Sequence, residues 1–423
     1  MTIPELHRFF LAHQTVSTDT RKITENCIFF ALKGPNFNGN AFAKEAIDKG
    51  AALAIIDEGE FDTDQTVLVD NVLETLQALA LYHRNQCKAK VLALTGSNGK
   101  TTTKELIHIV LATTYRTIAT TGNLNNHIGV PLTLLSITKE TEVAIVEMGA
   151  NHQKEIEFLS GLSQPDFGCI TNFGKAHLEG FGGVEGVIKG KSELYDHLLA
   201  NNRHVFLNAD DPIQREKLST YDKKFGFSQE GHGFYRITFL GANPFVEIQF
   251  EGTKVKTQLT GAYNFPNCAV AILIGNYFNI DPVTIKGALE SYIPENNRSQ
   301  ILKRKGHHIV LDAYNANPTS MQVALESFSK IDGDQKNIFL GDMFELGEDT
   351  AREHQYIANL ALTLEFKNVY LVGENFAKTK TDFQQFNSFD TLKNSFDFTS
   401  LPKGPMLIKG SRGMAMERIL ELL

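Results

Sequence analysis

The chain has 423 residues, which suggests two to four domains that can each bury a core. Its formal net charge of −8 argues against general nucleic-acid binding, because such binding favours a basic face. The cysteines at positions 27, 87, 169 and 268 form no CxxC pair. This spacing argues against a zinc site or a disulfide framework and is typical of a protein from the reducing cytoplasm.

No part of the sequence has the character of a targeting signal or a membrane span. The first ten residues, MTIPELHRFF, lack the basic start and the long apolar run of a signal peptide. No apolar stretch approaches the roughly 20 residues that cross a bilayer. We therefore expect a cytoplasmic protein without stable membrane insertion.

Residues 1–88 are predicted to form a small α/β unit. Apolar runs at 27–32 and 52–56 indicate strands, and a helical pattern at 42–49 lies between them. The polar segments 17–21 and 33–40 flank the first strand and are rich in hydrogen-bond donors. They are candidates for binding an anionic or sugar ligand, although ordinary capped turns explain them equally well.

A phosphate-binding loop is predicted directly after a buried strand at 91–95. The loop Gly96-Ser97-Asn98-Gly99-Lys100-Thr101 leads into an amphipathic helix, and backbone N–H groups at such a helix start can cradle phosphates. Lys100 can reach the β- and γ-phosphates, and the Thr101 hydroxyl can bind Mg²⁺. The spacing is GxxGKT, since Leu94 occupies the position of the first glycine of the common GxxxxGKT pattern.

Strands and helices alternate from this loop to about residue 210, which favours a parallel sheet covered by helices. The expected strands are 143–146, 167–171 and 205–208, and the expected helices include 72–87 and 184–199. Ligands of open α/β sheets bind beyond the carboxyl ends of the strands. Glu147 and His177 follow two of these strand ends.

Taken alone, these two residues leave their roles open. Glu147 follows an apolar strand, where a carboxylate is costly unless it is solvated, caps a helix or binds a metal. His177 is a metal ligand or a core histidine, and Mg²⁺ prefers oxygen over imidazole. Lys191, on the predicted helix 184–199, has the character of an ordinary surface lysine.

The rest of the chain is predicted to add an antiparallel appendage and a third unit. Short antiparallel strands are expected at 235–240, 245–250 and 254–259, followed by an apolar helix at 268–278. A doubly wound α/β unit is expected from residue 294, and a helix at 413–423 closes the chain. The strands of this third unit are predicted at 308–311, 337–340, 369–372 and 406–408.

Several long motifs carry a resemblance to a known family. They are TGSNGKTTTKE (95–105), TGNLNNHIGVPLTLL (121–135), VEMGANHQKEI (146–156), LDAYNANPTSM (311–321), LGDMFELGEDTAREH (340–354) and LIKGSRGMAME (407–417). In this order they resemble the Mur ligases, ATP-dependent peptide ligases of peptidoglycan synthesis, over essentially the whole chain. The family's short phosphate loop accounts for the GxxGKT spacing.

The resemblance implies an α/β protein of three domains. These are an N-terminal UDP-sugar-binding domain (1–88), a central ATP-binding domain (89–293) with a mostly parallel sheet and the antiparallel appendage, and a doubly wound C-terminal domain (294–423). NANPTS stands in the region where the ligase that adds the third peptide residue carries DNPR. This implies the branch that joins D-alanyl-D-alanine to UDP-N-acetylmuramoyl-tripeptide through an acyl phosphate.

ATP and Mg²⁺ would be the cofactors, and the protein would act as a monomer. Alternative interpretations are another Mur-type ligase, a ligase of the folylpolyglutamate synthase type, and a non-catalytic nucleotide-binding protein. The last would be expected to have lost Thr101, Glu147 or Lys191, and all three are present.

Residue roles follow from the resemblance alone. The catalytic residues would be Lys100, Glu147, His177, Lys191, Arg298 and Asp312. ATP would contact Gly96, Ser97, Asn98, Gly99, Lys100, Thr101, Thr102, Asn264, Asn267, Arg298 and Asp312. The substrates would contact Thr20, Arg21, Lys33, Asn123, Asn125, Asn126, Asn315, Asn317 and Asp342. Mg²⁺ would be held by Thr101, Glu147, His177 and a carbamate on Lys191. Tyr263 and Asn40 stand where the family often has histidine.

Overall fold

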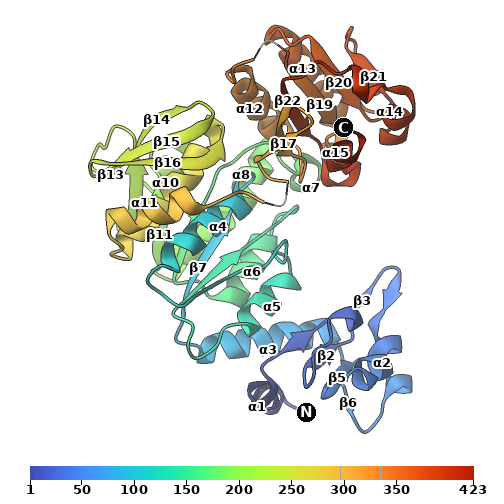
Figure 1. Ribbon diagram of the computed structural model, residues 1–423. Helices are drawn as coiled ribbons and strands as arrows, with labels where there is room; N and C mark the ends of the chain where they lie inside the picture. Colours follow the sequence, from blue (N-terminus) through green and yellow to red (C-terminus); the bar gives the residue numbers. More distant parts are fainter. Residues whose placement is uncertain (296, 334) are drawn as a thin grey trace.

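The computed structural model describes residues 1–295, 297–333 and 335–423, which form three α/β units in chain order (Figure 1). The N-terminal unit has a parallel sheet in the order β1-β2-β5-β6. Strands β2 and β5 are buried along their whole length, as expected for parallel strands covered on both faces. Its elements are α1 (Ile3–His13), β1 (Val16–Ser17), β2 (Ile28–Phe30), β3 (Lys33–Gly34), β4 (Phe37–Asn38), α2 (Ala43–Asp48), β5 (Leu53–Ile56), β6 (Thr66–Leu68) and α3 (Val72–Gln86).

The central unit is built on a seven-stranded sheet in the order β13-β12-β11-β10-β7-β9-β8, and all its pairings are parallel. Strand β7 lies between β10 and β9, so the phosphate loop that follows it opens near the middle of the sheet edge. The strands are β7 (Lys90–Thr95), β8 (Thr117–Ala119), β9 (Val143–Glu147), β10 (Phe167–Ile170), β11 (His204–Asn208), β12 (Lys224–Ser228) and β13 (Tyr235–Arg236).

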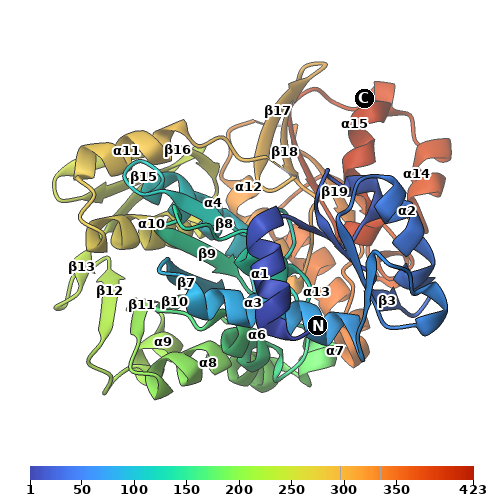
Figure 2. The same ribbon diagram turned by 90° about the horizontal axis from the view of Figure 1, so that it is seen from below.

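Helices cover both faces of this sheet (Figure 2). The apolar face of α4 packs on β8, β9 and α10, and Leu106, Ile107, Val110 and Leu111 are buried, as its pattern predicts. The helices are α4 (Lys100–Leu111), α5 (Gly129–Leu135), α6 (Glu155–Ser163), α7 (Leu178–Phe181), α8 (Val184–Ala200), α9 (Pro212–Lys217), α10 (Phe265–Tyr277) and α11 (Pro282–Ser291).

The appendage differs in one detail from the expected strands. Residues 235–240 do not form a single antiparallel strand, because Tyr235–Arg236 pair in parallel with β12 and a new strand begins at Thr238. Ile237 is fully buried at the change from one sheet to the other. The antiparallel sheet consists of β14 (Thr238–Ala242), β15 (Phe245–Phe250) and β16 (Thr253–Thr260).

The C-terminal unit has a six-stranded sheet in the order β17-β18-β22-β19-β20-β21, parallel except for β17. Its elements are β17 (Gln300–Arg304), β18 (His307–Asp312), α12 (Pro318–Ser329), β19 (Asn337–Gly341), α13 (Thr350–Thr363), β20 (Asn368–Val372), β21 (Gln384–Phe386), α14 (Phe389–Ser395), β22 (Pro405–Lys409) and α15 (Ile419–Leu422). The prediction of a single helix at 413–423 is wrong. Two 3₁₀ turns precede the short α15, since Ala415 has a left-handed backbone (φ 47°) that a continuous helix excludes.

Helix α7 of the central unit packs against the C-terminal unit (Figure 1). Leu178 and Phe181 belong to the apolar cluster that also contains Met343 and Leu346 of the C-terminal unit. The Glu179 N–H points to the Glu345 carbonyl at 3.4 Å. Among the described residues, no helix is both long and apolar enough to cross a membrane.

A buried histidine pair joins α1 to α3 and makes stability depend on pH. His7 Nε2 lies 3.0 Å from His83 Nδ1, and His83 Nε2 lies 2.8 Å from the Ile137 carbonyl. Burial lowers both pKa values from the ordinary 6.5, and the mutual repulsion of the two rings adds to this for His7. The folded chain therefore binds fewer protons than the unfolded chain just below pH 6.5.

We expect the free energy of unfolding to fall as the pH drops below 6.5 toward the lowered pKa values of the folded state. In His83→Gln, whose amide can still donate to the Ile137 carbonyl, this pH dependence should become weaker. Urea unfolding at several pH values between 7.5 and 5 measures it, with exposed His308→Gln as the control. An unchanged slope in His83→Gln would contradict the assignment.

Candidate active site

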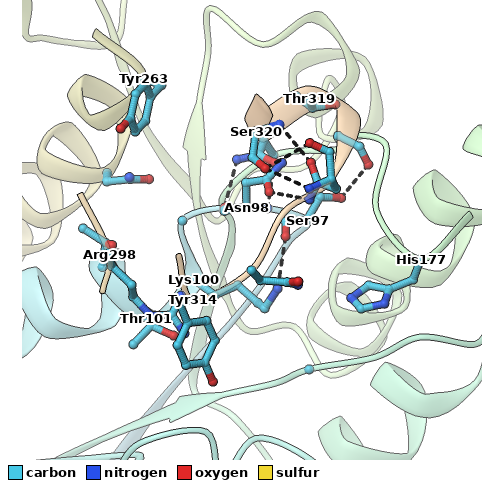
Figure 3. Close-up of a pocket in the computed structure, with 18 of the residues that line it drawn as sticks. Ser97, Asn98, Lys100, Thr101, His177, Tyr263, Arg298, Tyr314, Thr319 and Ser320 are labelled. Atoms are coloured by element: carbon cyan, nitrogen blue, oxygen red, sulfur yellow. Dashed lines mark hydrogen bonds between the residues drawn. The ribbon is translucent and has the colours of Figure 1, made fainter. Parts of the chain in front are cut away.

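A cavity of about 870 Å³ lies between the central and C-terminal units, and the phosphate loop forms part of its wall. Figure 3 shows Ser97, Lys100 and Thr101 of the phosphate loop and Thr319 and Ser320 of α12 among the residues that line it. Of the predicted site residues, the cavity is lined by Ser97, Asn98, Gly99, Lys100, Thr101, Thr102, Asn123, Asn125, Asn126, Glu147, His177, Asn264, Asn267, Arg298, Asp312, Asn315 and Asn317.

The phosphate loop has the backbone that its glycines predict. Gly99 has φ 80°, and a Cβ there would lie 2.5 Å from Asn267 Oδ1, so the position needs glycine for conformation and for space. Lys100 Nζ donates to the Gly96 carbonyl at 2.7 Å. Burial lowers the pKa of Lys100, the Glu147 charge opposes this shift, and Arg298 adds to it.

Glu147 at the end of β9 carries the clearest sign of a missing partner. Its Oε1 accepts hydrogen bonds from Thr101 Oγ1 at 3.2 Å and from Asn125 Nδ2 at 2.8 Å. Its Oε2 is buried without any partner in the described residues. A buried carboxylate oxygen without a donor is costly, and a cation beside it would remove that cost. The chemistry of Glu147 and Thr101 therefore fits Mg²⁺, which prefers oxygen ligands.

The other two predicted metal residues lie in different surroundings. His177 lines the cavity, but its Nδ1 is hydrogen-bonded to the Glu345 carboxylate, which lowers the pKa of Glu345.

Lys191 does not line the cavity and is no surface lysine, since its side chain is completely buried. Its Nζ donates to the Ala150 carbonyl at 2.9 Å and lies 4.8 Å from the centre of the Phe181 ring. Burial, followed by repulsion from Lys100, moves the pKa of Lys191 well below its usual value.

The predicted adenine residues form a network behind the phosphate loop. Asn264 Nδ2 donates to the Thr260 carbonyl at 2.8 Å, and Asn264 Oδ1 accepts from Asn267 Nδ2 at 2.9 Å. Asn267 Oδ1 in turn accepts from Thr103 Oγ1 at 3.1 Å. Tyr263, at the family's histidine position, also lines the cavity and is hydrogen-bonded to Ser299.

The C-terminal unit closes the cavity with charged and amide side chains. The Arg298 guanidinium lies 3.5 Å from the centre of the Tyr314 ring, a cation–π contact that restricts the arginine. Asp312 forms an ion pair with Lys409. Asn317 caps α12 by accepting from the Ser320 N–H, and its Nδ2 donates to Asn98 Oδ1 of the phosphate loop at 2.7 Å.

Some predicted substrate residues lie apart from the cavity. Arg21 donates two hydrogen bonds to the Asp19 carboxylate. Lys33 forms ion pairs with Asp57 at 3.0 Å and with Glu58 at 3.3 Å. The N-terminal unit carries these residues together with Thr20, and none of the three lines the cavity. Asp342 also lies outside it, where its buried carboxylate accepts the N–H groups of Asn375 and Phe376.

Sequence reasoning missed several residues that line the cavity, among them Tyr314 and Asn172. Tyr314 stands inside the YNANP motif beside Asn315, and its aromatic character could have marked it as a stacking partner. Asn172 follows β10 and holds the phosphate loop: its Oδ1 accepts from the Asn98 N–H and its Nδ2 donates to the Asn98 carbonyl. The rule that functional side chains follow strand ends could have found it.

Comparison with known proteins gives a family for this arrangement. Three family models match in order: "Mur ligase family, catalytic domain" over residues 13–84, "Mur ligase middle domain" over 94–275, and "Mur ligase, glutamate ligase domain" over 297–395. The UDP-N-acetylmuramoyl-tripeptide–D-alanyl-D-alanine ligase of Bacillus subtilis is 32% identical, covering 96% of this chain and 92% of the relative. The chain belongs to the Mur ligase family.

Other Mur ligases agree with this assignment. The Escherichia coli ligase with the same name is 31% identical over 99% of this chain and 95% of its own length. The MurF crystal structure from Acinetobacter baumannii superposes with a TM-score of 0.84 at 29% identity, covering 98% and 97% of the two chains. A Thermotoga maritima MurF ligase in complex with ADP also gives a TM-score of 0.84, at 26% identity, covering 97% of each chain. The expected three-domain Mur ligase fold is thus confirmed.

Proposed function

We propose that this Mur ligase uses ATP to join D-alanyl-D-alanine to UDP-N-acetylmuramoyl-tripeptide, forming the pentapeptide precursor of peptidoglycan. One observation carries the proposal. A single cavity is lined by the phosphate loop, by the loop containing Asn123 and by the YNANP loop of the C-terminal unit. Nucleotide, acceptor and dipeptide can therefore meet at one place, as a reaction with three substrates requires.

The reaction makes an amide from a carboxylate, which is a poor electrophile because it is anionic. The acceptor carboxylate attacks the γ-phosphorus of ATP, a new O–P bond forms, and the bond to the β-phosphate oxygen breaks to release ADP. The dipeptide amine then attacks the acyl carbon, and phosphate leaves. Each step crowds negative charge, so positioning and neutralisation supply most of the catalysis.

The residues of the cavity fit these tasks. Lys100 and Arg298, which line the cavity, would bring positive charge to the phosphates. Asn264 and Asn267, which line it beside the phosphate loop, would contact the adenine. Thr101 and Glu147 would hold a first Mg²⁺. His177 and Glu147, with a carbamate on Lys191, would serve a second. Bound Mg²⁺ would supply positive charge that neutralises the phosphate oxygens during phosphoryl transfer.

The two peptide substrates would contact different parts of the chain. Asn123, Asn125 and Asn126 would contact the UDP-sugar-peptide, whose uridine diphosphate would lie on the N-terminal unit near Thr20, Arg21 and Lys33. Asn315 and Asn317 would hold the dipeptide. The residues assigned to the three substrates all belong to one chain, so a monomer would suffice for the reaction. The use of ATP and a UDP-activated precursor supports reaction in the cytoplasm.

The test is ATP cleavage by the purified protein with each substrate omitted in turn. Phosphate release should depend on both the UDP-linked tripeptide and D-alanyl-D-alanine, and mass spectrometry should find the UDP-linked pentapeptide. The rates with acceptors that carry diaminopimelate or lysine as third residue are compared to identify the preferred acceptor peptide. ATP turnover that ignores both substrates would overturn the proposal. Activity with a folate and glutamate, or with a UDP-linked dipeptide, would favour one of the alternative ligases instead.

A further inference from the structure

Lys104 is a buried charge that the proposed chemistry does not use. It lies in α4, one turn beyond Thr101, and its side chain is completely buried. The chain retains an ammonium group in the interior, although an apolar side chain of similar length would avoid the cost of removing that charge from water. Such a lysine calls for a specific partner.

The partner is a backbone carbonyl at a structural junction. Lys104 Nζ donates to the Thr120 carbonyl at 2.5 Å and forms an ion pair with Glu105 at 2.7 Å. Thr120 directly follows β8, where the chain leaves the sheet beside β9 (Figure 2). The ammonium thus connects the helix of the phosphate loop to the first residue of the segment 120–128.

Thr120 is itself bonded to the strand that ends in Glu147. Its Oγ1 accepts from the Glu147 N–H at 3.0 Å, and its N–H donates to the Ile145 carbonyl at 2.9 Å. Its Oγ1 also lies 3.4 Å from Thr133 Oγ1 of α5. Four elements, α4, β8, β9 and α5, therefore meet at this one residue.

The segment beyond Thr120 makes a second contact with Glu147, this time with its carboxylate. Asn125 Nδ2 donates to Glu147 Oε1 at 2.8 Å, and the Asn125 carbonyl accepts from the Gly149 N–H at 2.7 Å. The segment is therefore held by hydrogen bonds at Thr120 and at Asn125. Asn123, between these two residues, and Asn126, directly after the second, line the cavity. A shift at Thr120 would reach both the asparagines and Glu147.

We propose that Lys104 is a positioning residue, which holds the segment 120–128 against α4 and thereby orients Asn125 and Glu147 at the reacting groups. It touches neither nucleotide nor peptide itself. The role assigned to the segment rests on the proposed function, in which its asparagines contact the UDP-linked acceptor. The contacts of Lys104 are independent of that function.

Lys104→Met is the decisive variant, because methionine fills nearly the same length without an ammonium. In the full-length protein, hydrogen exchange of the backbone amides in 117–129 should become faster, while the amides of α4 remain protected. The half-saturating Mg²⁺ concentration should rise roughly tenfold, as is typical when an outer partner of a metal ligand is lost. The KM for the UDP-linked acceptor should also rise, and the KM for D-alanyl-D-alanine should stay within about twofold.

Exposed Lys139→Met is the matched control, since Lys139 also pairs with the glutamate that follows it. It should change none of these quantities. Lys104→Arg, which keeps a donor, should restore part of the Mg²⁺ affinity, and Lys104→Gln serves as the test variant if Lys104→Met does not fold.

Unchanged exchange in 117–129 would overturn the positioning role, even in a preparation without ligase activity. An equal rise of all KM values, in step with a loss of thermal stability, would also overturn it, because that pattern reflects general destabilisation. If the wild-type protein does not ligate the proposed substrates but the exchange result holds, the proposed function fails and the role of Lys104 in ordering this segment stands.

Discussion

Glu147→Gln is expected to lower the rate of ligation by about 10²–10³-fold, the loss typical when one preorganised electrostatic group is removed from a site. The substitution keeps the shape of the side chain and the contact with Asn125, but it removes the charge. Because Glu147 Oε2 is buried without a partner among the described residues, the wild-type carboxylate is poised to meet a cation. Steady-state kinetics at increasing Mg²⁺ measures the loss.

Thermal unfolding adds a second readout for this variant. A buried, unpaired carboxylate oxygen destabilises the ligand-free fold, so Glu147→Gln should unfold at the same temperature as wild type or at a higher one. Glu142→Gln, at an exposed position just before β9, is the control and should leave both activity and stability near wild type. Ligation by Glu147→Gln within tenfold of wild type at saturating Mg²⁺ would contradict the metal role.

Lys191→Ala is expected to abolish measurable ligation, a loss of at least about 10²-fold. The Lys191 side chain is completely buried, and burial with repulsion from Lys100 moves its pKa well below the usual value. The neutral amine, which this environment favours, is the form that reacts with CO₂ to give a carbamate. A carbamate would supply oxygen ligands where an ammonium would repel Mg²⁺.

The control is Lys189→Ala, two residues earlier on the exposed face of α8, which should retain activity. Wild-type enzyme that has been freed of CO₂ and assayed in a sealed vessel should lose activity and regain it when bicarbonate is added. Full activity of Lys191→Ala would remove the lysine from the metal site. Loss of activity without any dependence on bicarbonate would leave a structural role and remove the carbamate.

Several features of the fold could be predicted from local sequence patterns. The buried run 91–95, the glycine loop and the amphipathic α4 are decided by residues close together in the chain, and the structure has all three as expected. The sequence also predicts Glu147 and His177 near the phosphate loop, because carboxyl ends of parallel strands share one edge, and both line the cavity.

Local patterns misled where distant contacts dominate. Apolar and polar side chains alternate along residues 235–240, a pattern that predicts one strand. In the structure β13 pairs with β12 and β14 pairs with β15, and the buried Ile237 lies between the two strands. The pattern of 413–423 is helical, yet the left-handed backbone at Ala415 divides it, and Met416 is fully buried against the C-terminal sheet. Packing against other elements outweighs helix propensity in such short segments.

The sequence by itself determined the family motifs, the phosphate loop and the order of strands and helices, since these depend on neighbours in the chain. Only the tertiary structure decided that Lys191 is buried rather than exposed, that Lys104 reaches Thr120, and that Arg298 lies on Tyr314. Burial and charge environment arise from elements far apart in sequence. An identical lysine on a helix is therefore a solvated surface group or a desolvated reactive one according to what the rest of the fold places around it.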